Sequence, residues 1–264
     1  MKKIIFFGNG MLADYALGVL KQHFEVIFHA RTKDDLTEAV RLKKEFSEAH
    51  GVLASFGVMV ESDVLEVFEP EGILNIHPSL LPKYRGASPI ESAILNGDTE
   101  FSVSIMKLTK AMDAGPIYCQ ATLRDLPLEK AAIYQALAEA GAEWLVKNMG
   151  DLPTPVPQDD SKATFTRKFE KKDGLVDLAT ETVDGILRKI VAFAGFPKVK
   201  TEIYGVNCAI LEAHKVGDGE KARLVLHCLD GEIAIDVLQP DGRKAMDAQG
   251  FLNGYAKKQP RCDC

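Results

Sequence analysis

The sequence predicts an α/β protein with a second, smaller β-rich domain, and three observations lead to this prediction. Short apolar runs alternate with amphipathic helical patterns over the first 150 residues, which is typical of a mainly parallel sheet with helices on both faces. Three prolines follow within residues 150–160. Beyond them, short β patterns separated by glycine turns predict a small OB-like β-barrel. We therefore expect a Rossmann-like domain followed by this barrel.

The elements of the first domain are predicted from the period of the apolar residues. The apolar run Lys3–Gly8 predicts a strand, and apolar side chains fall on one face of a helix over Met11–Gln22. The other expected strands are 24–29, 51–56, 73–77, 101–108 and 116–123. The other expected helices are 34–48, 62–68, 88–96 and 129–148.

The pattern changes after a stiff, proline-rich segment. Pro153, Pro155 and Pro157 predict an extended linker over 150–163. We therefore expect one domain over 1–149 and a β-rich domain over 164–264. In the second domain, one amphipathic helix is expected over 181–193, and strands are expected over 200–204, 209–213, 222–229 and 233–238.

The overall charge excludes one class of protein. The 264 residues include 32 Lys and Arg against 38 Asp and Glu, a net charge of −6, which argues against a basic protein that coats nucleic acid. The charge is uneven, with 15 basic against 22 acidic residues in 1–159 and 17 against 16 in 160–264. No apolar run reaches the roughly 20 residues of a membrane helix, so no membrane association is expected.

The five cysteines indicate a reducing compartment. Only Cys262 and Cys264 lie close together, and they lack a second pair of metal ligands. We interpret them as part of a tail, and no metal is expected. We expect a cytoplasmic monomer.

A glycine-rich turn follows the first strand. Residues 8–13 read Gly-Asn-Gly-Met-Leu-Ala, which matches the G-x-G-x-x-A pattern of a dinucleotide-binding turn. The second strand lacks the acidic residue that would hold a ribose, although Arg31 would suit a 2′-phosphate. An NADP-binding oxidoreductase is therefore one alternative, and a tight strand–helix turn without a ligand is the other.

The polar residues with the clearest chemical meaning lie between 72 and 115. Asn75 and His77 project from the same face of a predicted strand because side chains at i and i+2 point the same way. They stand at its carboxyl end, where parallel sheets bind ligands. Asp113 lies in the loop between the strands predicted over 101–108 and 116–123.

An amide, an imidazole and a carboxylate suit acyl transfer to an amine. Asn75 and His77 would donate hydrogen bonds to the oxygen of the attacked carbonyl, each worth roughly 3–4 kcal/mol. Asp113 would take the amine proton and orient His77, worth roughly 10²–10⁴ in rate. No serine lies in a G-x-S-x-G elbow, so direct transfer is favoured over a covalent acyl-enzyme.

The run Asn75–Gly86 (NIHPSLLPKYRG) and the later Asp113-Ala114-Gly115 resemble the 10-formyltetrahydrofolate-dependent formyltransferases. The resemblance implies that Asn75, His77 and Asp113 are catalytic and that 10-formyltetrahydrofolate is the co-substrate. It also implies a set of folate-binding residues: Phe56, Gly57, Val58, Ser79, Leu80, Leu81 and Pro82.

The second domain resembles the branch of this family that acts on initiator methionyl-tRNA. Two segments carry the resemblance, Lys189–Pro197 (KIVAFAGFP) and Val237–Asn253 (VLQPDGRKAMDAQGFLN). It implies that the β-rich domain contacts the tRNA. The basic residues that fit this role are Arg167, Lys168, Lys171, Lys172, Lys198 and Lys200, with Lys257, Lys258 and Arg261 near the end.

Two departures from the methionyl-tRNA branch leave a second acceptor open. That branch carries a longer, basic insertion after the second strand, whereas here only a short, charge-balanced segment separates His29 from Gly51. It also opens with G-T-P-x-F-A, which differs from residues 8–13. A sugar-amine (nucleotide-sugar) N-formyltransferase is therefore the first alternative, ahead of the NADP-binding protein.

Overall fold

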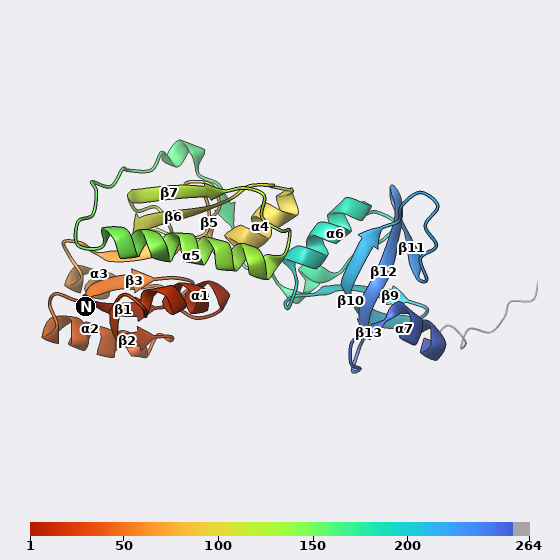
Figure 1. Ribbon diagram of the computed structural model, residues 1–264, viewed down its shortest axis with the longest axis horizontal. Coiled ribbons are helices and arrows are strands. Elements are labelled where there is room, and N and C mark those ends of the chain that lie inside the picture. Colours follow the sequence, from red (N-terminus) through yellow and green to blue (C-terminus); the bar gives the residue numbers. More distant parts are fainter. Residues whose placement is uncertain (256–264) are drawn as a thin grey trace, which may run out of the picture. The chain divides into compact units, whose positions relative to one another are not determined.

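The computed structural model describes residues 1–255, which form two compact units (Figure 1). The first unit comprises Met1–Ala93 and Asp98–Lys168, and the second comprises Ile94–Gly97 and the chain from Phe169 onward. The segment that we predicted as a linker, 150–163, is thus grouped with the first unit. Some residues on which we placed expectations lie outside the described part: Lys257, Lys258, Arg261, Cys262 and Cys264.

Strands and helices alternate through most of residues 1–168, and all but two short strands and one 3-10 helix follow the order that the apolar periodicity predicts. The strands are β1 (Lys3–Phe7), β2 (Glu25–Ala30), β3 (His50–Leu53), β4 (Ile73–His77), β5 (Arg85–Gly86), β6 (Phe101–Lys107), β7 (Ile117–Leu123) and β8 (Phe165–Thr166). The helices are α1 (Met11–Leu20), α2 (Asp35–Glu45), α3 (Ser62–Val67), α4 (Pro89–Asn96), α5 (Lys130–Asn148) and the 3-10 helix η1 (Asp160–Lys162).

The first unit is built on a six-stranded sheet with the order β2-β1-β3-β4-β6-β7. The first four of these strands are parallel, whereas β6 runs antiparallel to β4 and β7 antiparallel to β6. The predicted Rossmann-like, mainly parallel sheet is confirmed. The central strand β4 therefore lies where the sheet changes from parallel to antiparallel pairing.

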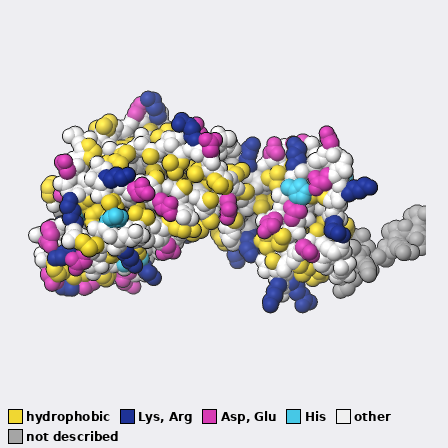
Figure 2. Space-filling view, in the orientation of Figure 1, with side chains coloured by type: hydrophobic (Ala, Val, Ile, Leu, Met, Phe, Trp, Pro, Cys, Tyr) yellow, Lys and Arg dark blue, Asp and Glu magenta, His cyan; other side chains and the backbone are white. Residues whose placement is uncertain are grey.

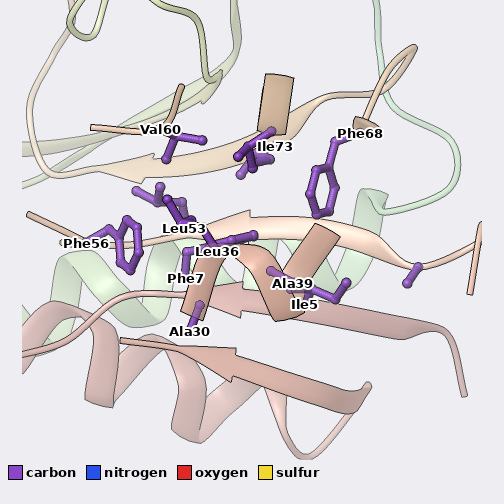
Figure 3. Packing of buried hydrophobic residues seen from close by; sticks show 12 residues of the cluster. Ile5, Phe7, Ala30, Leu36, Ala39, Leu53, Phe56, Val60, Phe68 and Ile73 are labelled. Carbon is purple, nitrogen blue, oxygen red and sulfur yellow. The ribbon is translucent and has the colours of Figure 1, made fainter. Parts of the chain in front are cut away.

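Both faces of this sheet are covered by helices. On one face, Ile5 and Phe7 of β1 pack with Leu36 of α2 in a core that also includes residues of β3, α3 and β4 (Figure 3). On the other face, α1 and α5 lie side by side and α5 contacts β4 and β6 (Figure 1). Gly141 of α5 permits this close approach, since a Cβ there would stand 2.6 Å from Ile76.

The glycine-rich residues 8–13 form a tight strand–helix turn. The Gly8 amide donates to the Ala30 carbonyl at 2.9 Å. A Cβ at Gly8 would lie only 2.0 Å from the Ala54 carbonyl oxygen, so backbone packing alone requires glycine there. Arg31, the residue on which the NADP alternative depends, is exposed and directs Nε toward His29 Nδ1 at 3.4 Å.

The second unit is an antiparallel sheet with two helices. Its elements are the 3-10 helix η2 (Lys171–Gly174), α6 (Val183–Ala192), β9 (Val199–Ile203), β10 (Val206–Lys215), β11 (Val225–Cys228), β12 (Gly231–Pro240), β13 (Met246–Asp247) and α7 (Ala248–Tyr255). The strand order is β11-β12-β10-β9, with β13 beside β12. This sheet forms a curled half-barrel, in agreement with the predicted β-rich fold.

Two helices complete the second unit. The helix α6 begins at Thr182, whose side chain accepts from the Gly185 amide, and it buries Ile186 and Ile190. The sequence pattern did not reveal α7, which is held by Phe251 packing against Tyr204 and Tyr255. None of the helices within residues 1–255 is both long and apolar enough to cross a bilayer.

Candidate active site

The candidate site starts at the carboxyl end of β4. Asn75 and His77 are two positions apart on this strand, and both are buried, with 4% and 5% of their surface exposed. Their main chains pair with Met106 and Ser104 of β6. Polar side chains so far inside a protein require partners or a function.

His77 is held by the main chain of the loop that follows its strand. Its Nε2 atom lies 3.1 Å from the carbonyl oxygen of Tyr84. Because a carbonyl only accepts hydrogen bonds, Nε2 must be the donor. The other ring nitrogen, Nδ1, lies 3.7 Å from Oδ1 of Asp113. The structure thus brings together two of the three residues that the sequence predicted to be catalytic.

Asp113 reaches His77 from the loop between β6 and β7. Its backbone adopts a left-handed conformation with φ 47°, which is unusual for a residue with a side chain. Its Oδ2 atom accepts a hydrogen bond from the Gly86 amide at 2.8 Å. One carboxylate oxygen is thus fixed by the backbone, while the other faces the imidazole.

The side chain of Asn75 differs from those of His77 and Asp113 in its hydrogen bonding. Among residues 1–255 it forms no hydrogen bond to another residue, although its neighbours on the strand are fully paired. Among the described residues only Glu91 Oε2 is a fully buried side-chain polar atom without a partner, so the Asn75 amide is not sealed off from the site. Its N–H groups are therefore available to an oxygen of a bound molecule.

The loop between β4 and β5 is rigid. Ser79 donates to the Lys83 carbonyl at 2.6 Å, and Ser104 donates to the Ser79 carbonyl at 2.6 Å. The Leu81 amide donates to the Ser104 hydroxyl at 3.1 Å. Lys83, at the outer end of the loop, donates to Asp98 at 2.8 Å, and this hydrogen bond raises the pKa of Lys83.

The predicted folate-binding residues differ in exposure. Gly57, Val58 and Leu80 are at least partly exposed, and 44% of the surface of Leu80 is accessible. Phe56 and Leu81 are both 3% exposed, and the Phe56 ring packs against Phe7 in the core.

The predicted tRNA-binding residues are divided between the two units. Arg167 and Lys168 belong to the first unit, and the other four belong to the second. Lys171 and Lys172 are exposed. Lys198 donates to Gln239 at 2.9 Å and Lys200 to Asp241 at 2.7 Å. Figure 2 shows Lys and Arg interspersed with Asp and Glu over the visible face of the first unit.

Three groups that shape the site were not found from the sequence. Gly86 and the Tyr84 carbonyl hold Asp113 and His77 through the backbone, and Gln158 binds the loop of Asp113. Backbone groups carry no residue-specific signal. Gln158 lies in the segment interpreted as a linker, and only its contacts reveal its role.

Comparisons with known proteins agree along most of the chain. Residues 19–149 match the Formyl transferase family and residues 168–256 match Formyl transferase, C-terminal domain. A methionyl-tRNA formyltransferase of Granulibacter bethesdensis is 32% identical over 255 residues, which cover 91% of this chain and 77% of that protein.

Two solved structures resemble the fold. The structure of methionyl-tRNA formyltransferase from Clostridium thermocellum matches with a TM-score of 0.67 at 17% identity and covers 91% of this chain and 98% of that one. HypX from Aquifex aeolicus, in complex with tetrahydrofolic acid, matches with a TM-score of 0.72 at 18% identity. The match covers 98% of this chain but only 48% of HypX, so this chain spans about half of that protein.

Proposed function

Because this chain belongs to the formyl transferase family, we propose that it transfers the formyl group of 10-formyltetrahydrofolate to the α-amino group of initiator methionyl-tRNA, a step of translation initiation. The observation that carries the proposal is the meeting of His77 and Asp113 at 3.7 Å beside the unpaired amide of Asn75. The NADP-binding alternative is not supported, because residues 19–149, which include Arg31, match the Formyl transferase family, and the similarity to a methionyl-tRNA formyltransferase extends over 91% of this chain.

The reaction needs no covalent enzyme intermediate. Bound 10-formyltetrahydrofolate supplies the formyl carbon, and the amine of the acceptor forms a new C–N bond to it while the bond to the folate nitrogen breaks. Asn75 donates a hydrogen bond to the formyl oxygen as negative charge develops there. Asp113 accepts the proton that the amine loses and returns it to the folate nitrogen, so that the folate leaves as tetrahydrofolate.

His77 has a restricted part in this scheme. Its Nε2 proton is used by the Tyr84 carbonyl, so His77 can donate to the formyl oxygen only through Nδ1. A proton on Nδ1 lies between the ring and Asp113 Oδ1. Nδ1 is therefore the ring atom through which His77 acts on Asp113 and on the formyl oxygen.

The residues present fit a reduced folate. The amide of Asn75 can donate to an oxygen of the folate, and the exposed Leu80 offers apolar surface at the same end of β4. We place the co-substrate along Ser79–Pro82, with Gly57 and Val58 near its ring system. The C-terminal unit is the proposed tRNA-binding part, with Lys171 and Lys172 as contacts to phosphate.

The compartment is inferred from the thiols. Cys119, Cys208 and Cys228 are free, which suits a reducing environment. We place the protein in the cytoplasm as a monomer. No cluster of three metal-binding side chains occurs among the residues described, and the proposed steps use the side chains named above.

A second acceptor is favoured by one observation. The region between β2 and β3 holds only the short helix α2, in which Arg41 is paired with Glu38 and Glu45. The Arg41 charge is therefore neutralised by these two carboxylates and does not provide a positive contact for the acceptor end of a tRNA. A sugar-amine acceptor is therefore the second candidate.

The two acceptors are distinguished by one set of assays. The protein is incubated with 10-formyltetrahydrofolate and either charged initiator tRNA or an amino-sugar nucleotide, and tetrahydrofolate release is followed. The proposal predicts release only with the tRNA, and tRNA binding that weakens steeply with salt. Release with the amino-sugar nucleotide alone would replace the proposed acceptor, and release with neither would overturn the proposed activity.

A further inference from the structure

The segment from Val156 to Thr166, here called the strap, is bound along the first unit. At its start, Val156 and Ile117 exchange two main-chain hydrogen bonds of 2.8 Å. At its end, Phe165 and Thr166 of β8 pair with Arg85 and Gly86 of β5. The strap therefore connects the start of β7 with the loop that holds His77 and Asp113.

Gln158 lies between these two attachments and faces the Asp113 loop. Its Nε2 atom donates to the main-chain carbonyl of Asp113 at 2.8 Å and to that of Gly115 at 2.7 Å. Both N–H groups of one amide are thus used to hold two carbonyls of the same loop. Since Asp113 has a left-handed backbone, the loop needs such external contacts to keep its conformation.

Gln158 is itself fixed by Arg85. Its Oε1 atom accepts hydrogen bonds from Arg85 Nε at 3.1 Å and from an Arg85 terminal nitrogen at 2.8 Å. Arg85 is only 4% exposed, and its charge is balanced by Asp160 of the strap at 2.6 Å. The side-chain amide of Gln158 therefore cannot rotate without breaking four hydrogen bonds.

These contacts close a ring around the proposed proton acceptor. The Gly86 amide, next to Arg85, holds the Asp113 carboxylate at 2.8 Å. The Arg85 side chain holds Gln158, and Gln158 holds the Asp113 main chain. The position of Asp113 Oδ1 relative to His77 is thus determined from both ends of the residue.

We propose that Gln158 is a positioning residue for Asp113, through which the strap sets the distance between the carboxylate and His77. The role of Asp113 itself rests on the proposed function, whereas the mechanical coupling does not. Gln158 does not touch the reacting atoms in this scheme, and its effect is transmitted by the loop that carries Asp113.

Two substitutions test the hydrogen bonds of the Gln158 side chain. Gln158→Glu keeps an oxygen acceptor for Arg85 but places a second oxygen against the Asp113 and Gly115 carbonyls. Gln158→Ala removes all four hydrogen bonds. The matched control is Asp159→Asn, one residue away on the strap, because within residues 1–255 the Asp159 side chain bonds only to Ser161 and Lys162 of the strap itself.

The first readout is hydrogen exchange in the full chain without any substrate. We expect both Gln158 variants to speed exchange of the Gly86 amide and of residues 110–115 by about tenfold or more, since local opening becomes easier. Asp159→Asn should change these rates less than about twofold. Unchanged exchange at Gly86 in the Gln158 variants would overturn the proposed coupling.

The second readout is the split between kcat and KM for formyl transfer. Misplacing the carboxylate should lower kcat about 10- to 100-fold and leave both KM values within about threefold, measured at a temperature where the variants remain folded. Faster exchange combined with normal kcat would overturn the positioning role. If the wild-type protein transferred no formyl group, the proposed function would be wrong. The hydrogen-exchange rates would still test whether Gln158 holds the Asp113 loop.

Discussion

The His77 ring donates through Nε2 to the Tyr84 carbonyl at 3.1 Å, so the backbone of the next loop fixes the orientation of the imidazole. Only Nδ1 remains for chemistry, and it faces Asp113. The two side chains therefore form one functional unit, and their substitutions should not have additive effects on the rate.

Asp113→Asn tests the proton acceptor. The amide keeps an oxygen for the Gly86 amide but cannot take a proton from the amine, so kcat should fall by about 10²–10⁴. His77→Ala alone should also reduce kcat by orders of magnitude. In the Asp113→Asn background, the same substitution should reduce kcat by a much smaller factor. Steady-state kinetics of both single variants and the double variant measure this. Near-normal turnover of the two single variants would refute the assignment.

Asn75→Ala tests the hydrogen bond to the formyl oxygen. Removing one such donor costs about 10²–10³ in kcat. Because the Asn75 amide has no partner among the described residues, its loss should leave the free energy of unfolding nearly unchanged. Denaturant unfolding and kinetics measure the two effects. A large loss of stability with unchanged kcat would assign Asn75 to the core.

Gly115→Ala tests the packing of the loop that carries Asp113. A Cβ at Gly115 would lie 1.9 Å from the Lys107 carbonyl oxygen, so the loop must move and both stability and kcat should fall. The loss of stability should be about 1–3 kcal/mol. Gly18→Ala in α1 is the control, since nothing lies within 4 Å of its Cβ and a helical Ala should be neutral or stabilising. Equal melting temperatures for Gly115→Ala and the wild type would contradict this packing.

His214 in the second unit predicts a pH-dependent stability. Its Nε2 and Nδ1 atoms each lie 2.7 Å from a carboxylate, that of Glu220 and that of Asp236. These hydrogen bonds raise the pKa of His214. A raised pKa in the folded state stabilises the fold below the ordinary value of about 6.5, and the gain is lost as pH rises through the raised pKa.

His214→Gln should therefore lower the melting temperature at about pH 6 and have little effect at about pH 9. The effect is small because the side chain is 45% exposed. Thermal unfolding of the variant and the wild type at both pH values measures it. A larger deficit at the higher pH would contradict the protonated ring.

The sequence predicted the local parts of this site because they depend on local rules. The alternation along β4 places Asn75 and His77 on one face, and apolar periodicity locates most helices and strands within a few residues. The carboxylate of Asp113 was found from chemistry and from resemblance, since nothing local links it to His77.

The remaining features depend on contacts between distant segments. β5 and β8 have two residues each and exist only because they pair with one another, so no periodicity marks them. Pro153, Pro155 and Pro157 predicted an extended linker, but an extended chain can still bind a surface, as Val156 does at Ile117. Gln158 therefore has a role that only the folded chain reveals.

In the proposed mechanism the formyl group passes directly to the acceptor amine at the site of Asn75, His77 and Asp113. The most direct test follows radiolabelled formyl from 10-formyltetrahydrofolate in a single turnover with charged initiator tRNA, for the wild type and Asp113→Asn. We predict label on the methionyl amine with one tetrahydrofolate released for each formyl group, and no transfer on the same timescale in Asp113→Asn. Label trapped on the protein, or equal rates for both proteins, would contradict the claim.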